Sequence, residues 1–316
     1  MAKRSRTFAR RLRKQTLVIL RQLAHGVRRG KTTFGNILKT SLKSLLFFVR
    51  LPRHVRDVLG INLLKRASAK SRAEAVDALL SESITVKTPH GPIRFLCHGR
   101  LSSSRASKLM TREPDSLKWI DRIEPGAIFW DIGANIGTLT LYAARREALK
   151  IWSFEPAATN FYQLAANCEL NGYSKEIRCL QLGFSHQASI SNLCVSQLAP
   201  GRSFSFRHHA DKDFNAWQSV LLWTIDEFIE HYEVPCPNYI KIDVPGLTND
   251  ILEGAAATLT RPEVKQLQIE APEHGRSGRH IIPLLEKYGF QIIHRNFRYP
   301  KRRKPVQRDL VFGRTF

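Results

Sequence analysis

The segment Phe129–Gly137, with the sequence FWDIGANIG, constrains the fold of this chain more than any other feature. Its first residues are apolar, as in a buried strand, and its two glycines mark a tight turn. Glu155 follows 18 residues after Gly137, directly behind the apolar stretch 151–154. A strand, a glycine turn, a helix and a second strand that ends in a carboxylate are the plan of a nucleoside-binding half of an α/β sheet.

The spacing of the glycines discriminates between cofactors. A dinucleotide-binding turn has glycines at relative positions 1, 3 and 6, so that a pyrophosphate rests on the helix N-terminus. Here Gly133 and Gly137 occupy positions 1 and 5, whereas Asn135 and Thr138 occupy positions 3 and 6. This form favours a ligand without phosphates, such as S-adenosylmethionine. We expect the glycines to let the backbone pass close to that ligand, where a Cβ atom would clash.

The acidic and amide side chains around this turn are candidate cofactor ligands. Glu155 is placed to accept hydrogen bonds from both ribose hydroxyls. Asp131 is expected to hold the glycine turn or to reach the methionyl amine, and Asn135 to bond near the same group. The alternative is an ordinary strand–turn–helix with glycines in a loop. The predicted cofactor-binding residues are Asp131, Gly133, Asn135, Gly137, Glu155 and Pro156.

An ordered set of motifs resembles the FkbM family of S-adenosylmethionine-dependent methyltransferases. The motifs are Thr111–Asp115 with Trp119-Ile120, the FWDIGANIG segment, Phe154–Pro156 with Asn160, Asn167 with Asn171-Gly172, Thr224–Phe228, Ile240–Gly246 and Ile251–Ala255. The chain departs from the family pattern at one place. The family often has Asp-Val-Glu-Gly followed two residues later by another Glu, and this chain has Pro245 and Thr248 there.

Buried strands that alternate with helices predict an α/β fold with a doubly wound, mostly parallel sheet, which is the Rossmann-like fold that the resemblance implies for class I methyltransferases. Strands are expected over 127–132, 151–154, 177–182, 221–225, 239–244, 266–271, 290–294 and 310–312, and helices over 117–123, 138–146, 160–171, 225–232, 249–259 and 281–288. A hairpin over 84–97 is expected at a sheet edge because it contains Pro89 and Pro92. Residues 185–220 do not fit the repeat, and we interpret them as an insertion over the carboxyl edge of the sheet.

Three side chains at strand ends are the candidate catalytic residues. Asp243 lies at the carboxyl end of a central strand and is the leading candidate for a general base or a substrate-orienting group. Lys241 shares its face of the strand and can keep Asp243 ionised. A structural carboxylate and a salt bridge without a catalytic role are the alternatives. Glu270 ends the next strand and is the second candidate base, against a solvated acid at a strand end.

Cysteine and histidine usage predicts no metal. The five cysteines are odd in number and form no C-x-x-C pair, so a disulfide framework is not expected and a reducing compartment fits best. His208 and His209 are adjacent, and adjacent side chains point apart on an extended chain. They remain candidates for a base in the insertion.

The positive charge is concentrated at the N-terminus. Of a formal net charge of +23, residues 1–53 carry 15 lysines or arginines and no acid, which leaves about +8 for the other 263 residues. The apolar runs 17–20 and 45–49 are shorter than the ~20 residues of a membrane span. We therefore expect a basic helical extension over 1–83, a methyltransferase domain over 84–316, and a cytoplasmic protein that can contact the anionic inner membrane face through 1–53. A solvated tail and a cleavable presequence are the alternatives for this segment.

The resemblance implies an S-adenosylmethionine-dependent methyltransferase that modifies a hydroxyl group of a saccharide, a glycolipid or a secondary metabolite, so the expected partner is a small-molecule or glycan acceptor. One alternative is a nucleic-acid methyltransferase that uses the basic segment, although no RNA-binding module or aromatic stacking platform accompanies it. Another is a binding protein on a methyltransferase scaffold. The loop spacing disfavours a dehydrogenase.

Overall fold

The structure is a computed structural model that describes residues 82–314, apart from 97, 147, 196–200, 202–204, 207–215, 272 and 299–305. Residues Ser83–Phe316 form one unit of the chain. Nearly all of the predicted basic extension over 1–83 lies outside the described residues, as do His208 and His209. The division of the chain at residue 83 stays a prediction.

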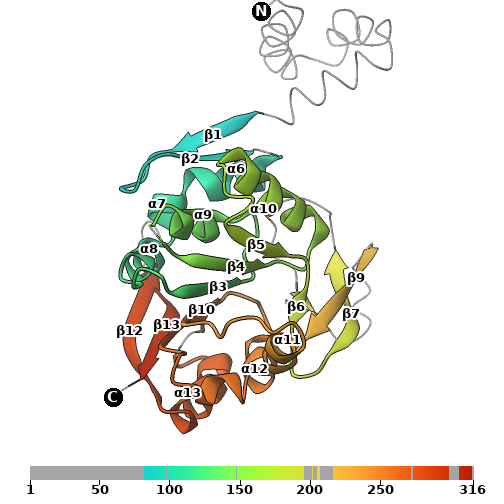
Figure 1. The fold of residues 1–316 in the computed structure, drawn as a ribbon, viewed down its shortest axis with the longest axis vertical. Coiled ribbons are helices and arrows are strands. Elements are labelled where there is room, and N and C mark those ends of the chain that lie inside the picture. Colours follow the sequence, from blue (N-terminus) through green and yellow to red (C-terminus); the bar gives the residue numbers. More distant parts are fainter. Residues whose placement is uncertain are drawn as a thin grey trace, which may run out of the picture. The chain divides into compact units, whose positions relative to one another are not determined.

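A seven-stranded sheet forms the centre of the unit (Figure 1). Its strands are β3 (Ile128–Ile132), β4 (Lys150–Phe154), β5 (Ile177–Leu180), β10 (Tyr239–Ile242), β11 (Gln266–Glu270), β12 (Phe290–Arg298) and β13 (Val306–Arg314). Their order is β12-β13-β11-β10-β3-β4-β5, and only β13 runs antiparallel to its neighbours. The predicted fold class, a doubly wound and mostly parallel sheet of the class I methyltransferase type, is confirmed.

Helices cover both faces of this sheet (Figure 1). They are α8 (Pro114–Asp121), α9 (Thr138–Ala144) and α10 (Ala158–Leu170) on one face, and α11 (Ile225–His231), α12 (Thr248–Glu253) and α13 (Arg276–Lys287) on the other. The alternation of side chains along β3 shows why two cores form. Phe129 packs in the core with α8, α9 and α10, whereas Trp130 and Ile132 pack with α11, α12 and α13. Asp131 shares the Phe129 side, and its carboxylate is therefore buried beneath α9.

The strand order places a ligand-binding crevice beside β3. From β3 the chain proceeds through β4 to β5 on one side and later through β10 to β11 on the other. In open α/β sheets, ligands bind at the carboxyl ends of the strands where the winding changes direction. The glycine turn Gly133–Gly137 follows β3, Glu155 follows β4 and Asp243 follows β10, so all three predicted groups lie at this point.

Residues 185–220, interpreted from the sequence as an insertion over the carboxyl edge of the sheet, contain regular strands where the structure describes them. The described part forms a four-stranded sheet of β6 (Gly183–Phe184), β7 (Ser189–Val195), β8 (Ser205–Phe206) and β9 (Ala216–Trp223), in the order β6-β9-β7-β8. Strand β9 begins well before the strand expected at 221–225. Leu193, Val220 and Leu222 pack with Ala157 in a small core of their own. Serine and asparagine in β7 obscure the period-two pattern that this core requires.

The hairpin of β1 (Ser83–Val86) and β2 (Ile93–Leu96) forms as predicted, but it is a separate two-stranded sheet and not an edge of the central one. Helix α10 holds it in place. Asn167 Oδ1 accepts a hydrogen bond from Leu96 N at 2.8 Å, and Asn171 Oδ1 accepts one from Arg94 N at 2.9 Å. Two helices follow the hairpin in the chain and were not expected from the sequence. They are α6 (Arg100–Ser107) and α7 (Leu109–Arg112).

The helix expected over 249–259 is interrupted. Helix α12 ends at Glu253, and a short 3-10 helix follows at Thr258–Thr260. Gly254 lies between them, where a Cβ atom would stand 2.1 Å from the carbonyl oxygen of Ser185. Close packing on the segment after β6 therefore explains the glycine.

Candidate active site

The glycine turn after β3 makes room for neighbouring protein segments. Gly133 has φ of 82°, and a Cβ atom there would lie 2.4 Å from the carbonyl oxygen of Asp243. Gly137 has φ of 84°, and a Cβ atom there would lie 2.6 Å from Leu164 Cδ1. We expected these glycines to clear the path of a ligand. The structure shows a further reason, which is the close approach of the β10 loop and of α10. The clearance for a ligand stays a prediction.

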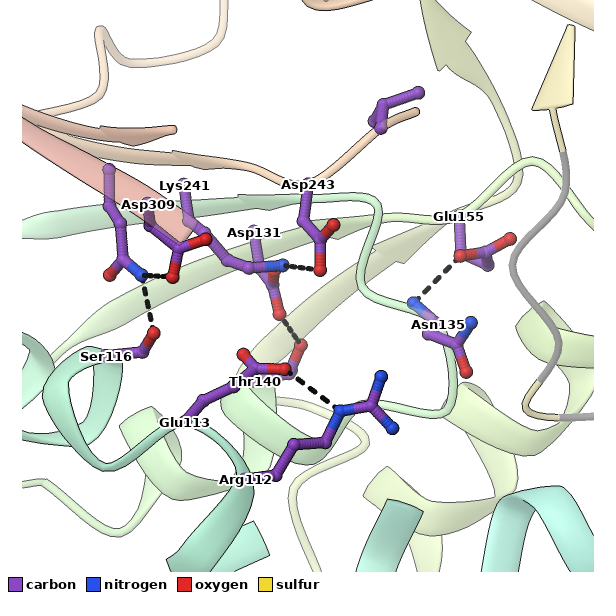
Figure 2. Close-up of polar contacts among 12 residues, drawn as sticks. Arg112, Glu113, Ser116, Asp131, Asn135, Thr140, Glu155, Lys241, Asp243 and Asp309 are labelled. Atoms are coloured by element: carbon purple, nitrogen blue, oxygen red, sulfur yellow. Dashed lines mark hydrogen bonds and ion pairs between the residues drawn. The ribbon is translucent and has the colours of Figure 1, made fainter. Parts of the chain in front are cut away.

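Glu155 is the buried carboxylate of the turn, with 5% of its surface exposed. Its Oε2 accepts a hydrogen bond from Asn135 N at 2.8 Å (Figure 2). Its Oε1 accepts from Ala157 N at 3.0 Å and from Asn160 Nδ2 at 3.3 Å. Burial raises the pKa of Glu155 to about 7, against the opposing effect of these hydrogen bonds. Asn135 adopts a left-handed backbone with φ of 54° that directs its N–H at this carboxylate.

Asp131 bonds to the core and not to the glycine turn. Its Oδ2 accepts a hydrogen bond from Thr140 Oγ1 at 2.6 Å, and the Thr140 hydroxyl also lies 2.9 Å from Ser153 Oγ. Its Oδ1 lies 3.1 Å from Lys241 Nζ. The carboxylate thus pairs with Lys241 on the neighbouring strand. Its expected hold on the glycine turn or contact with the methionyl amine stays a prediction.

Lys241 is a fixed cation. Burial opposes its charge, but the attraction of Asp131, Asp243 and Glu113 outweighs burial and raises the pKa of Lys241 above its ordinary value. An ammonium group that stays protonated at neutral pH cannot accept a proton. Lys241 is therefore suited to orienting carboxylates and not to acting as a general base.

Asp131, Lys241 and Asp243 form a row that leads from the core to the surface (Figure 2). Lys241 Nζ lies 3.7 Å from Asp243 Oδ2 on its outer side. The exposed fractions of the three side chains rise from 1% through 7% to 23%. Asp243 is the only member of this row that an acceptor can reach readily, which agrees with its place as the leading candidate.

The structure places Glu270 one strand farther from the turn. It is the last residue of β11 and stands opposite Asp309 of β13 in the strand register. Pro156, the remaining predicted cofactor residue, follows Glu155 and accepts a hydrogen bond at its carbonyl from Gln218 Nε2 at 2.8 Å. That bond joins the loop after β4 to the small sheet. The catalytic and cofactor roles of all the named residues stay predictions.

A small pocket between the start of α8 and the strands β12 and β13 is lined by residues that no sequence pattern marks as a site. Arg112 and Glu113 lie where α7 meets α8, and Asn296 and Asp309 come from β12 and β13. Arg112 Nε lies 3.4 Å from Glu113 Oε1 (Figure 2). The motif Thr111–Asp115 had suggested the first pair, but only through the family resemblance. Asn296 and Asp309 sit in strands where no sequence signal marks them.

Two other kinds of feature, a metal site and a membrane span, are absent from the described residues. Within the described ranges, no three histidine, cysteine, aspartate or glutamate side chains group as a metal site would require. No helix in the part of the chain that the structure covers is long and apolar enough to cross a membrane.

The arrangement at the carboxyl ends of β3 and β4 fits S-adenosylmethionine. The ligand's ribose hydroxyls need an acceptor at the end of the second strand, and Glu155 is a buried acceptor there, oriented by the backbone N–H groups of Asn135 and Ala157. The turn has no third glycine to bring a pyrophosphate against the helix.

Known proteins resemble the chain over about half of its length. The hexuronic acid methyltransferase AglP of Haloferax volcanii is 25% identical over 154 residues, which cover 48% of this chain and 59% of that relative. The chain thus spans less than two thirds of the relative's length. Among solved structures, the methyltransferase FkbM of Methylobacillus flagellatus aligns with 60% of this chain and 44% of its own, at 16% identity and a TM-score of 0.43. The magnesium protoporphyrin IX methyltransferase of Synechocystis, with bound S-adenosylmethionine, aligns with 64% and 77%, at 14% identity and a TM-score of 0.38.

The family described as the methyltransferase FkbM domain matches residues 131–292. This match covers 162 of the 316 residues, from the buried Asp131 of β3 into β12, and it includes Glu155 and the Lys241–Asp243 pair. It confirms the predicted family and the predicted cofactor, S-adenosylmethionine. The chain belongs to the FkbM methyltransferase family.

Proposed function

We propose that this methyltransferase modifies a hydroxyl group of a sugar-containing acceptor, such as a saccharide or a glycolipid. The observation that carries the proposal is the row Asp131–Lys241–Asp243, which ends in an accessible carboxylate at the crevice beside β3. A hydroxyl acceptor must lose a proton during methyl transfer, so it needs a base at this place. The similarity to a relative named as a hexuronic acid methyltransferase supports a sugar acceptor.

Binding of the cofactor is assigned to the turn. The carboxylate of Glu155 accepts hydrogen bonds from the ribose hydroxyls, while the N–H groups of Asn135 and Ala157 keep it oriented. S-Adenosylmethionine supplies an electrophilic methyl group on a sulfonium centre. The protein's part is to hold the acceptor oxygen in line with that methyl group, because orientation alone lowers the barrier of such a transfer.

Deprotonation of the acceptor is assigned to Asp243. One of its carboxylate oxygens takes the hydroxyl proton as the oxygen attacks, and the exposed side of the group returns the proton to water. Lys241 restrains the carboxylate from its inner side, and Asp131 with Thr140 restrains Lys241. The buried Asp131–Lys241 ion pair thus keeps the carboxylate of Asp243 in position, and only Asp243 accepts the proton.

Transfer of a radiolabelled methyl group tests this function. The full chain is incubated with S-adenosylmethionine labelled in its methyl group and with separate saccharide, glycolipid and RNA fractions. We expect label in a saccharide or glycolipid fraction and its release by acid treatment as a methylated sugar. Label in RNA alone would overturn the proposal in favour of a nucleic-acid methyltransferase.

A further inference from the structure

Cys168 and Cys179 are two free cysteines that the fold brings into contact. Cys168 belongs to α10, and Cys179 belongs to β5, the edge strand of the central sheet over which α10 packs (Figure 1). Their sulfur atoms lie 3.6 Å apart and share a hydrogen bond. The sulfur atoms of a disulfide bond are about 2 Å apart, so the two thiols are near neighbours that are not joined.

The two thiols differ in their access to solvent. Cys168 is 1% exposed and belongs to the core on the α10 side of the sheet, whereas Cys179 is partly exposed. The hydrogen bond from the Cys168 thiol lowers the pKa of Cys179. Because the thiolate is the reactive form of cysteine, Cys179 is the sulfur that a small oxidant attacks first. Cys168 is then in position to complete a disulfide bond.

Helix α10 contacts the turn to which cofactor binding is assigned. Asn167 Nδ2 donates a hydrogen bond to the carbonyl oxygen of Ile136 at 2.8 Å. One helical turn earlier, Leu164 packs against the turn where a Cβ atom at Gly137 would lie 2.6 Å from its Cδ1. Cys168 directly follows Asn167, so a force on Cys168 acts on the part of α10 that holds the turn.

Strand β5 contacts the other side of the same site. The backbone N–H of Glu155 donates a hydrogen bond to the carbonyl oxygen of Leu180 at 3.2 Å. Leu180 directly follows Cys179. Each cysteine is therefore one residue away from a hydrogen bond that positions the predicted cofactor site.

A disulfide bond would strain these two contacts. The sulfur atoms would have to approach by about 1.5 Å from their separation of 3.6 Å. Cys168 is buried in a close-packed core, and such cores do not deform freely, so the approach moves α10 relative to β5. The hydrogen bonds of Asn167 and of Glu155 N lie on the two elements that move.

We propose that Cys168 and Cys179 form a reversible disulfide bond that lowers the affinity for S-adenosylmethionine, so that the enzyme works when this pair is reduced. The proposal rests on the proposed function, since it regulates the turn to which cofactor binding is assigned. It also agrees with the cysteine usage of the chain, because disulfides in reducing compartments are usually transient and redox-sensing.

A small-molecule disulfide, such as oxidised glutathione, is the oxidant in this reaction. The Cys179 thiolate attacks one of its sulfur atoms, and the departing glutathione takes up the proton that Cys179 lost. Cys168 Sγ then loses its proton and attacks Cys179 Sγ, and the second glutathione leaves with that proton. Two protein thiols are thus oxidised to a disulfide, while one glutathione disulfide is reduced to two thiols.

Equilibration of the full chain with excess reduced or excess oxidised glutathione tests the proposal. Peptide mapping by mass spectrometry is expected to find Cys168 linked to Cys179 only in the oxidised sample. Calorimetry on both samples is expected to show S-adenosylmethionine affinity at least about fivefold lower after oxidation, the low end for coupling between two sites. Dithiothreitol should restore the affinity.

Three variants identify the cysteines responsible. Cys179→Ser and Cys168→Ala are each expected to keep the reduced affinity and to lose its sensitivity to oxidation, and either variant serves if the other does not fold. Cys236→Ser is the matched control, because Cys236 is also free and partly exposed, and it should behave like the wild type.

Several results would overturn the switch. They are the absence of the Cys168–Cys179 link in excess oxidised glutathione, an unchanged affinity in the linked wild type, and a loss of affinity that persists in Cys179→Ser and Cys168→Ala. A reduced wild-type chain that does not bind S-adenosylmethionine would instead overturn the proposed methyl transfer, on which the switch depends.

Discussion

At the scale of single residues, Glu155 carries the cofactor assignment. It is buried at the end of β4 with its oxygens aligned by two backbone N–H groups. We predict that Glu155→Ala weakens S-adenosylmethionine binding by ~1–3 kcal/mol, the usual loss when hydrogen bonds to a charged group are removed. Isothermal titration calorimetry measures this, with Glu169→Ala on the exposed side of α10 as the control. Equal affinities in the two variants would remove Glu155 from the site.

The raised pKa of Glu155 also predicts how stability depends on pH. Its pKa is 4.5 in an ordinary setting and about 7 in the fold, so the folded protein binds the proton more tightly than the unfolded chain does. Below pH ~4.5 the group is protonated in both states and does not lower the free energy of unfolding. As pH rises through ~7, its ionisation lowers the free energy of unfolding by up to about 3 kcal/mol.

Urea unfolding across this range checks the pH prediction. The difference in unfolding free energy between Glu155→Gln and the wild type is expected to grow in favour of the variant from pH 4.5 to 7, and then to stay constant. Parallel pH profiles for the two proteins would show that Glu155 titrates normally in the fold.

At the scale of elements, the turn after β3 is predicted to tolerate no side chain at Gly133. A side chain at Gly133 would be strained by the left-handed backbone, and its Cβ atom would also clash with the Asp243 carbonyl. Gly172, with φ of 80°, has the same backbone strain, but a Cβ atom there would have nothing within 4 Å. Gly172→Ala should cost only the ~1–2 kcal/mol of the left-handed conformation. Gly133→Ala should cost more and should also weaken S-adenosylmethionine binding, because it pushes β10 away from the turn.

Unfolding free energies and calorimetric affinities of the two alanine variants make this comparison. Equal destabilisation, with cofactor affinity intact in both, would contradict the contact between the turn and the β10 loop.

The local sequence pattern predicted the helices and strands around the predicted cofactor site. Strands β3, β4 and β10 are mostly apolar, and Gly172 follows the end of α10, so their positions could be placed within a few residues. The small sheet was missed because its strands carry serine and asparagine, and because β7 pairs with β9 across residues 196–215. Helix α6 was missed because RLSSSRAS shows almost no apolar period.

The residues of the candidate site likewise fall into those that the sequence predicted and those that only the fold reveals. Asp131, Glu155, Lys241 and Asp243 could be named from the sequence because each lies in, or directly after, a predicted strand at the nucleoside-binding end of the sheet. The pocket lined by Ser116, Asn296 and Asp309 could not be named from the sequence, because it joins distant segments. Gln268 bonds Ser116 across 152 residues, and only the folded sheet brings them together.

At the scale of the whole molecule, the basic segment 1–53 is proposed to hold the enzyme against an anionic membrane. Its 15 cations without an acid should each contribute ~1 kcal/mol where they reach the surface. We predict that the full chain sediments with phosphatidylglycerol vesicles at low salt and is released at high salt. A chain without residues 1–53 should keep its cofactor affinity and lose vesicle binding.

Two outcomes of the vesicle experiment would contradict membrane binding by residues 1–53. Equal sedimentation of the two chains would show that these residues do not bind the membrane. Tight binding of the full chain to RNA, with no binding to vesicles, would assign the charge to nucleic acid instead.

In the proposed reaction, Asp243 removes the proton of a hydroxyl acceptor beside a fixed Lys241 cation. The most direct test is the rate of labelled methyl transfer by wild type and Asp243→Asn, at saturating S-adenosylmethionine, with the saccharide or glycolipid fraction that the wild type modifies. The variant is expected to bind the cofactor with unchanged affinity and to transfer methyl at least ~100-fold more slowly, the low end for loss of a general base. A rate within a few-fold of the wild type would show that Asp243 is structural and that the acceptor loses its proton elsewhere.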